Sequence, residues 1–171
     1  MHNNEDNMAM FTIGIITASD KGARGEREDI SGKTIARMLK DIGTTKEYTV
    51  VPDVQELISQ EIVRMADECG IDLILTTGGT GLGPRDVTPE ATLAVIDRLV
   101  PGIPEAIRAK SLEKTSRAML SRAVAGVRGR TLIINLPGSP RGVEECLAVV
   151  LPALEHGLAI MKGQASECAR H

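Results

Sequence analysis

The sequence predicts a single α/β domain with three layers, a mostly parallel sheet carrying helices on both faces. Short apolar runs of strand length alternate along the chain with longer amphipathic stretches. The runs are continuously apolar, which is typical of strands covered on both sides. No repeat or linker interrupts the pattern, and 171 residues suffice for one sizeable core. We expect the folded domain over 10–164, after a disordered lead-in over 1–9 and before a C-terminal tail over 165–171.

Four apolar runs are the predicted strands. Each is followed by residues that favour turns, chiefly Gly, Pro, Ser and Asp. In chain order they are 11–17 (FTIGIIT), 47–51 (EYTVV), 71–76 (IDLILT) and 131–136 (TLIINL).

Five helices are predicted between and after these strands. Thr88 is the expected cap of the third, with Pro89 at its first position and Glu90 favouring the positive end of the helix. Pro152 should kink or restart the last one. The first helix runs from a cap at Asp29 or Ser31 to about Ile42, and the second from Leu57 to an end at Gly70. The third covers 88–99, the fourth continues from Pro104, and the fifth covers 142–161.

Composition excludes several classes of function. The net charge of −3 and the shortage of aromatic residues (one Phe, one Tyr, no Trp) argue against a nucleic-acid partner. The three cysteines form no CxxC pair, so neither a zinc site nor a disulfide framework is indicated. The acidic start lacks the features of a signal peptide, and no apolar run could span a bilayer. We therefore expect a cytoplasmic protein without a membrane partner.

The loop after the third strand is the richest in glycine. It contains Gly78, Gly79, Gly81 and Gly83, with Thr80 among them. Such a loop, running into a helix N-terminus, presents N–H groups to a phosphate or another anion. The alternative is that the glycines only make tight turns. The spacing matches neither the P-loop nor the dinucleotide-binding motif, so an ordinary NTPase or NAD site is not predicted.

Two carboxylates follow predicted strands at the same edge of the sheet. Asp53 ends the second strand region and Asp86 ends the glycine loop. Oxygen ligands beside a phosphate loop suit Mg²⁺, although each aspartate could instead cap a turn or a helix. The three histidines lie at the chain ends and late in the last helix, which disfavours a histidine-based site.

Other polar residues in these loops could serve an anionic ligand or simply cap a turn. Ser19 and Asp20 follow the first strand, and Ser139 lies in a rigid turn with Pro137 and Gly138. Arginines could pair with phosphate or stack on a planar ring. The candidates are Arg85, Arg122 and Arg141, of which Arg122 is the least explained by solvation because its neighbours are small and apolar.

Two segments carry a family resemblance, TTGGTGLGPRDVTPEAT (76–92) and AMLSRAVAGVRGRTLIINLPGSPRGVEECL (118–147). With them the chain resembles the MogA/MoaB family of molybdenum-cofactor biosynthesis proteins over about 11–162, and leans toward the MogA type. The resemblance implies the three-layer fold, commonly as a trimer. It implies adenylyl transfer from ATP, with Mg²⁺, to the terminal phosphate of molybdopterin, and delivery of the product to a molybdate-inserting MoeA-type protein.

The resemblance also implies roles for individual residues. Asp53 and Asp86 take the places of two catalytic or metal-positioning aspartates. The other positions line the phosphates or flank the pocket, namely Ser19, Asp20, Gly78, Gly79, Thr80, Gly81, Pro137, Gly138 and Ser139. Two alternatives remain at this point. One is a molybdopterin carrier without catalysis, which would not need both aspartates, and the other is a different Mg²⁺-dependent phosphate-ester enzyme.

Overall fold

The computed structural model describes residues 11–164, so the predicted lead-in over 1–9 and tail over 165–171 lie outside the described residues. Its sheet has the strand order β2-β1-β3-β6-β5-β4. The first four strands in that order are mutually parallel, and β5 and β4 are antiparallel to their neighbours. The strands are β1 (Phe11–Ala18), β2 (Gly43–Val51), β3 (Leu73–Thr77), β4 (Arg98–Leu99), β5 (Ala125–Arg128) and β6 (Thr131–Leu136).

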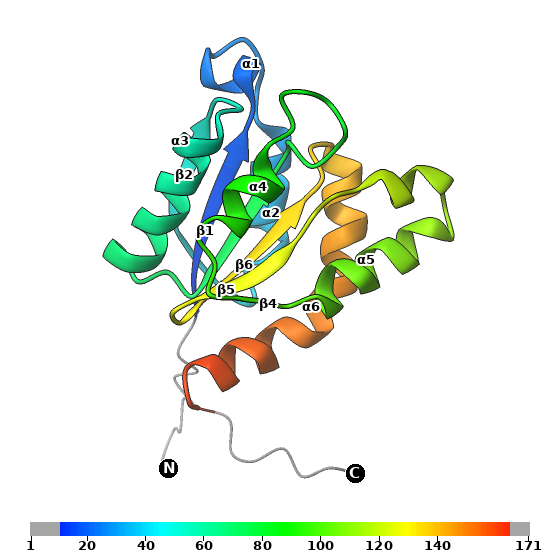
Figure 1. Cartoon of the computed structure of the whole chain (residues 1–171). Coiled ribbons are helices and arrows are strands. Elements are labelled where there is room, and N and C mark those ends of the chain that lie inside the picture. The colour runs from blue at the N-terminus through cyan, green and yellow to red at the C-terminus, as the bar shows by residue number, and fades with distance from the viewer. Residues whose placement is uncertain (1–10, 165–171) are drawn as a thin grey trace.

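Helices cover both faces of the sheet, which confirms the predicted fold class. Figure 1 shows α4 in front of the strands and α2 behind them. One face carries α2 (Ile30–Met38), α5 (Gly102–Leu112) and α6 (Pro140–Met161). The other carries α3 (Gln55–Val63), its π-helical continuation η1 (Arg64–Glu68) and α4 (Thr88–Leu93). Two short helical segments complete the described chain, α1 (Asp20–Ala23) and the 3₁₀ helix η2 (Ser116–Leu120).

The strand side chains divide between two hydrophobic cores. In β3, Leu73 and Leu75 pack toward α6, while Ile74 between them packs toward α3. Successive strand residues point to opposite faces, so a strand covered on both sides must be apolar throughout. This is why the continuous apolar runs mark the central strands.

The four predicted strands are confirmed, but the helix predicted over 88–99 is too long. It ends at Leu93, and the chain then forms β4, which pairs with β5. The backbone N–H groups of Asp97 and Val100 donate to carbonyls of β5. This pairing satisfies the backbone of an apolar segment whose periodicity alone favours a helix.

Helix ends differ from the predictions in smaller ways. Asp29, rather than Ser31, caps α2 through a hydrogen bond from the Gly32 amide. The predicted cap of α4 is wrong, because the buried Thr88 hydroxyl has no hydrogen-bond partner among the described residues and Val87 precedes the first helical residue. The last helix is continuous from Pro140 with Pro152 inside it, and its ribbon bends along its length (Figure 1).

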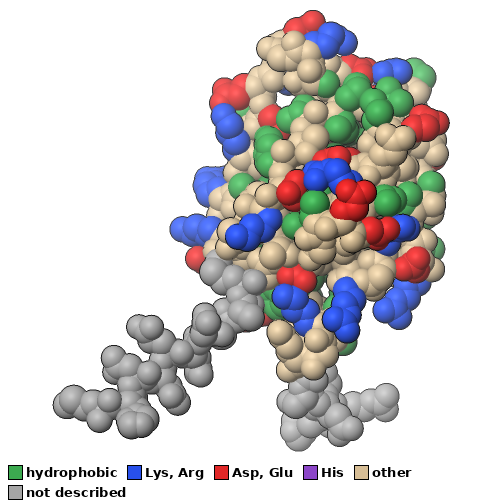
Figure 2. Space-filling view, turned by 90° about the vertical axis from the view of Figure 1, so that its left-hand side faces the viewer, with side chains coloured by type: hydrophobic (Ala, Val, Ile, Leu, Met, Phe, Trp, Pro, Cys, Tyr) green, Lys and Arg blue, Asp and Glu red, His purple; other side chains and the backbone are tan. Residues whose placement is uncertain are grey.

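The edge strand β2 carries charged and polar side chains. Arg64 donates to Glu47 on this strand and to Glu61 on α3. Figure 2 looks onto the side of the molecule that holds β2 and α3, where basic and acidic side chains are interspersed. Charge on an edge strand discourages pairing with another sheet. Within residues 11–164, no helix combines the length and apolar character needed to cross a membrane.

Candidate active site at the carboxyl edge of the sheet

A cavity of about 670 Å³ lies where the parallel strands end. Ligand sites in open parallel sheets are expected at this edge, and the volume is in the range of small-molecule pockets. The helices α2 and α6 also begin there, so their positive ends face the cavity. The lining residues are Thr17, Ala18, Ser19, Gly22, 27–31, Asp53, 77–79, Asp86 and 138–140.

Glycines let three loops meet backbone to backbone at the floor of this cavity. Gly78 has a φ of +92°, and a side chain there would overlap the carbonyl of Ala18. A Cβ at Gly138 would stand 3.3 Å from the Cα of Gly78. Side chains pin the same loops, since the Thr77 hydroxyl donates to the Pro137 carbonyl at 2.7 Å. The cavity floor therefore consists of main chain that a bound anion can approach closely.

Asp20 and Asp53 tie the loops after β1 and β2 together. The Asp20 amide donates to the Asp53 carboxylate at 2.9 Å, and the Asp53 amide donates to the Asp20 carboxylate at 3.0 Å. Arg85 in the glycine loop donates two hydrogen bonds to Asp20, at 2.8 and 3.0 Å. These bonds hold the glycine loop against the first two loops. Hydrogen bonds from Arg85 lower the pKa of Asp20.

The Asp53 carboxyl is held in an environment that disfavours its charge. Burial raises its pKa, and the nearby carboxylates of Asp20 and Asp86 raise it further. Asp86 lines the same cavity, with one carboxylate oxygen accepting from the Gly83 amide at 2.8 Å. Clustered carboxylates supply the hard oxygen donors that Mg²⁺ prefers, and a divalent cation would offset their repulsion. The residues present therefore fit a magnesium ion.

No cluster of three or more acidic, histidine or cysteine side chains within residues 11–164 could hold a metal by itself. This arrangement suits Mg²⁺, because that ion commonly keeps water and substrate phosphates among its ligands. Any magnesium bound here by Asp53 and Asp86 would therefore be completed by substrate oxygens.

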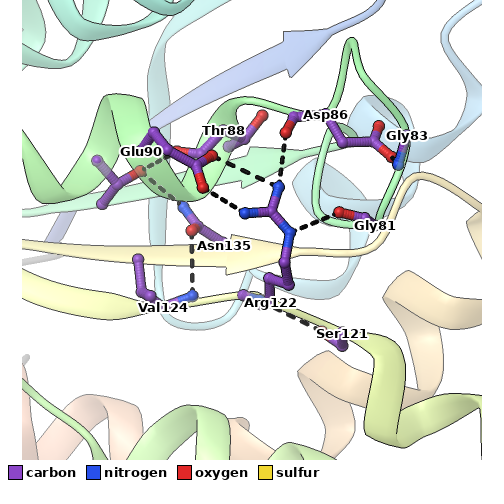
Figure 3. A network of polar contacts seen from close by, with 11 residues as sticks. Gly81, Gly83, Asp86, Thr88, Glu90, Ser121, Arg122, Val124 and Asn135 are labelled. Carbon is purple, nitrogen blue, oxygen red and sulfur yellow. Dashed lines mark hydrogen bonds and ion pairs between the residues drawn. The ribbon is translucent and has the colours of Figure 1, made fainter.

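Arg122, which was predicted to bind substrate or nucleotide, lies outside the cavity lining. Its guanidinium donates to the carbonyls of Gly81 and Asp86, at 2.7 and 2.6 Å, and forms an ion pair with Glu90 (Figure 3). Its own backbone N–H donates to the Thr80 carbonyl at 2.9 Å. Arg122 thus contacts the glycine loop through the loop carbonyls. Four other predicted residues also lie outside the cavity lining, namely Asp20, Thr80, Gly81 and Pro137.

Seven predicted residues do line the cavity: Ser19, Asp53, Gly78, Gly79, Asp86, Gly138 and Ser139. The hydroxyls of Ser19 and Ser139 each cap a helix that starts there, accepting from Gly22 and Gly142. Capping fixes these helix starts at the cavity wall.

Sequence analysis missed a second polar group at this site. The Asp29 carboxylate accepts from the Thr17 hydroxyl at 2.5 Å and from the Tyr48 hydroxyl. Asp29 was predicted only as a helix cap, and nothing in its local sequence shows that the cap lies on the cavity wall. Arg27 also lines the cavity and makes no hydrogen bond or ion pair within residues 11–164. It is the cationic side chain of a lining that otherwise carries carboxylates, those of Glu28, Asp29, Asp53 and Asp86.

Known proteins resemble this chain over most of its length. A family model described as "Probable molybdopterin binding domain" matches residues 14–156. The molybdopterin adenylyltransferase of Helicobacter pylori strain J99 is 42% identical over 159 residues, covering 91% of this chain and 90% of that protein. The molybdopterin adenylyltransferase of Escherichia coli K12 is 41% identical over 149 residues, covering 85% of this chain and 76% of the relative.

Solved structures agree in fold. The molybdopterin biosynthesis enzyme MoaB of Thermus thermophilus superposes with a TM-score of 0.86 at 52% identity, covering 92% of this chain and 100% of that one. The molybdopterin biosynthesis Mog protein of Mycobacterium ulcerans superposes with a TM-score of 0.83 at 41% identity, covering 91% and 99% of the two chains.

Proposed function

The chain belongs to the molybdopterin-binding domain family of molybdenum-cofactor biosynthesis, and from this premise we infer that it is a molybdopterin adenylyltransferase. It transfers AMP from ATP to the terminal phosphate of molybdopterin and releases pyrophosphate. The observation that carries this conclusion is the 42% identity to the Helicobacter enzyme over nine tenths of both chains. The cavity at the strand ends supports it with a main-chain floor suited to phosphates.

The chemistry asks the protein for alignment and charge neutralisation more than for acid–base catalysis. An oxygen of the molybdopterin phosphate bonds to the α-phosphorus of ATP, and the bond from that phosphorus to the bridging oxygen of pyrophosphate breaks. Both substrates are polyanions, so the amides of the glycine loop and the positive ends of α2 and α6 would offset their repulsion.

We assign Asp53 and Asp86 to holding a magnesium ion on the phosphates. Magnesium bound there would neutralise charge on ATP and on the leaving pyrophosphate. Asp53 is held toward the cavity by its reciprocal hydrogen bonds with Asp20. Ser19 and Ser139 sit at helix starts on the wall, where their hydroxyls could also contact phosphate. Arg27 supplies the positive side chain within the cavity lining.

We further propose that the protein is a homo-oligomer, with a trimer expected, that works in the cytoplasm. Apolar side chains are exposed on α5 and η2, at Leu112, Met119 and Leu120. Such residues gathered on one projecting segment favour burial against another copy. Adenylylated molybdopterin is an activated product, so it should pass to a molybdate-inserting protein of the MoeA type.

The deciding measurement is pyrophosphate release from ATP and Mg²⁺, with and without molybdopterin. We expect release only when molybdopterin is present. Molybdopterin bound without any release would instead make the protein a carrier. Release without molybdopterin would indicate a different phosphate-ester enzyme.

Asp86→Asn should abolish adenylyl transfer while largely sparing molybdopterin binding, because it removes a magnesium-binding charge but keeps the shape of the side chain. Turnover and binding measured on this one variant test the assignment. Glu113→Gln is a suitable control, since that carboxylate is exposed at the end of α5, outside the cavity lining, and pairs with Lys110. Turnover of Asp86→Asn equal to the unchanged protein would remove Asp86 from the mechanism.

A further inference from the structure

Six backbone N–H groups over 79–88 donate to no atom within residues 11–164, those of Gly79, Thr80, Gly81, Leu82, Arg85 and Val87. Three of them, those of Gly81, Leu82 and Val87, each follow a carbonyl that Arg122 binds. Arg122 binds the Thr80 carbonyl through its backbone N–H, and the other two, those of Gly81 and Asp86, through its guanidinium.

Peptide geometry links these two facts. Every described peptide bond is trans, so the C=O of one residue and the N–H of the next point in opposite directions. With three carbonyls directed at Arg122, the three following N–H groups must be directed away from it. Gly81, Leu82 and Val87 lie outside the cavity lining themselves, but their loop neighbours Gly79 and Asp86 line the cavity.

We propose that Arg122 is a positioning residue for adenylyl transfer, which holds the glycine loop by its carbonyls so that the loop amides and Asp86 face the substrate phosphates. This inference rests on the function proposed above. It replaces the expected role of Arg122 as a direct ligand of the substrate. The residue acts from behind the loop and touches neither substrate.

Glu90 provides the third acceptor for the Arg122 guanidinium. It lies in the first turn of α4, and its carboxylate pairs with the Arg122 guanidinium (Figure 3). That pairing lowers the pKa of Glu90. Three acceptors in different directions require the planar, multiply donating fork of arginine, which the single ammonium of lysine does not reproduce. Arg122→Lys therefore keeps the charge and loses the geometry.

A substitution at Glu90 also distinguishes the proposal from a simple effect of charge. If charge alone mattered, Glu90→Gln would remove a negative charge near two polyanions and so would lower the KM for ATP. If Glu90 acts by fixing Arg122, the same change lowers kcat. The two accounts therefore predict changes in different kinetic parameters, a lowered KM for ATP in the first and a lowered kcat in the second.

The experiment compares Arg122→Lys, Glu90→Gln and the double variant in molybdopterin-dependent pyrophosphate release. We expect kcat to fall about 10- to 100-fold in Arg122→Lys, with a much smaller change in the KM for ATP. Glu90→Gln should lower kcat in the same direction. The double variant should be no worse than Arg122→Lys alone, because both changes break one unit.

Hydrogen exchange of the loop amides that do donate hydrogen bonds, those of Gly83, Asp86 and Thr88, gives a second readout that needs no turnover. Exchange of these amides should accelerate in both single variants. The matched control is Arg128→Lys, because Arg128 also joins a carboxylate, that of Asp67, to a main-chain carbonyl, that of Val95, but lies away from the loop. Its kcat and its loop exchange should equal those of the unchanged protein.

Two results would overturn the proposal. One is Arg122→Lys with normal kcat and normal loop exchange, and the other is Glu90→Gln with a lowered KM and no loss of kcat. A raised KM for ATP in Arg122→Lys, with unchanged kcat and unchanged loop exchange, would point to direct phosphate contact instead. If the unchanged protein releases no pyrophosphate at all, the proposed function fails, and hydrogen exchange still decides whether Arg122 holds the loop.

Discussion

The hydroxyl of Thr88 lies fully buried beneath the glycine loop without a hydrogen-bond partner within residues 11–164. An unpaired buried hydroxyl costs about 1–3 kcal/mol of stability. Thr88→Val removes that hydroxyl at nearly constant shape. We expect it to increase the free energy of unfolding by about 1 kcal/mol, as measured by urea denaturation.

Thr92, one turn further along α4, is the matched control. It is equally buried, but its hydroxyl donates to the Thr88 carbonyl and accepts from Asn135. Thr92→Val should therefore decrease the free energy of unfolding. If the two variants changed stability in the same direction, the Thr88 hydroxyl would have a partner in solution.

Tyr48 is the single tyrosine of the chain, and its ionisation can be followed directly. Burial, and then the hydrogen bond to Asp29 with the charge of that carboxylate, raise its pKa well above the ordinary value of 10.0. The folded protein keeps the proton that the unfolded chain loses near pH 10. The stabilisation is therefore complete below that pH and declines as pH rises above it.

The absorbance of tyrosinate, followed as the pH is raised into the alkaline range, tests this prediction of a raised pKa. The folded protein should show little tyrosinate at a pH where the urea-unfolded protein is mostly ionised. Coincident titration curves for the two states would mean that Asp29 and Tyr48 are not in contact in solution.

Single residues also show where sequence reasoning reaches its limit. The paired aspartates, the glycine loop and Ser139 could be placed at one sheet edge because parallel strands end together. The direction of Arg122 could not, since a side chain that binds loop carbonyls and one that binds phosphate have the same sequence. Asp29 was recognisable as a cap, but its place on the cavity wall depends on the packing of α2 against the loop after β6, where Ser31 donates to the Gly138 carbonyl.

At the scale of elements, the glycine loop depends on Gly79. Its φ is +67°, and a Cβ there would overlap the Thr88 hydroxyl and stand 3.5 Å from the Asp53 carboxylate. Gly79→Ala should therefore incur both a conformational and a steric penalty. We expect its loss of stability to exceed that of Gly129→Ala by about 1–3 kcal/mol.

Gly129 is the control because it shares the positive φ, at +55°, but has open space around its Cβ position. Thermal or urea unfolding of the two variants gives the comparison. Equal losses would show that the loop relaxes around the new methyl group.

Of the four strands that were predicted and found, β1, β3 and β6 are buried on both faces, which fixes their apolar composition. The edge strand β2 is only partly buried. The short strands β4 and β5 were missed because their pairing is set by tertiary contact. Arg98 and Leu99 continue an apolar helical periodicity, and only the presence of Val127 and Gly126 beside them makes a strand the better solution. Length matters too, since two residues carry almost no periodic signal.

At the scale of the whole molecule, α5 and η2 project from one end of the sheet (Figure 1). Met119 is 64% exposed and Leu120 is 49% exposed on this segment. We expect the double change Met119→Asp and Leu120→Asp to dissociate the proposed oligomer, because each charge would have to be desolvated in an interface. Sedimentation velocity at micromolar concentration measures the result.

Leu57→Asp on α3 provides the comparison, since Leu57 is 40% exposed but lies on another part of the surface. It should leave the sedimentation coefficient unchanged. An unchanged oligomer in the double variant, or a monomer in the unchanged protein, would contradict the interface assigned to this segment.

Neighbouring strands in the centre of the sheet are not consecutive in sequence, and this affects how the protein folds. The cavity wall joins residues that are distant in sequence, such as Ser31 to Gly138 across 107 positions. The wall is complete only once β1, β3 and β6 have paired, and contacts of such long range form slowly. Substrate can therefore bind only after the barrier is crossed. A saturating nucleotide would slow unfolding and leave the refolding rate unchanged. In the cell, the nucleotide would therefore protect the protein by slowing its unfolding, and only after the whole chain has been synthesised.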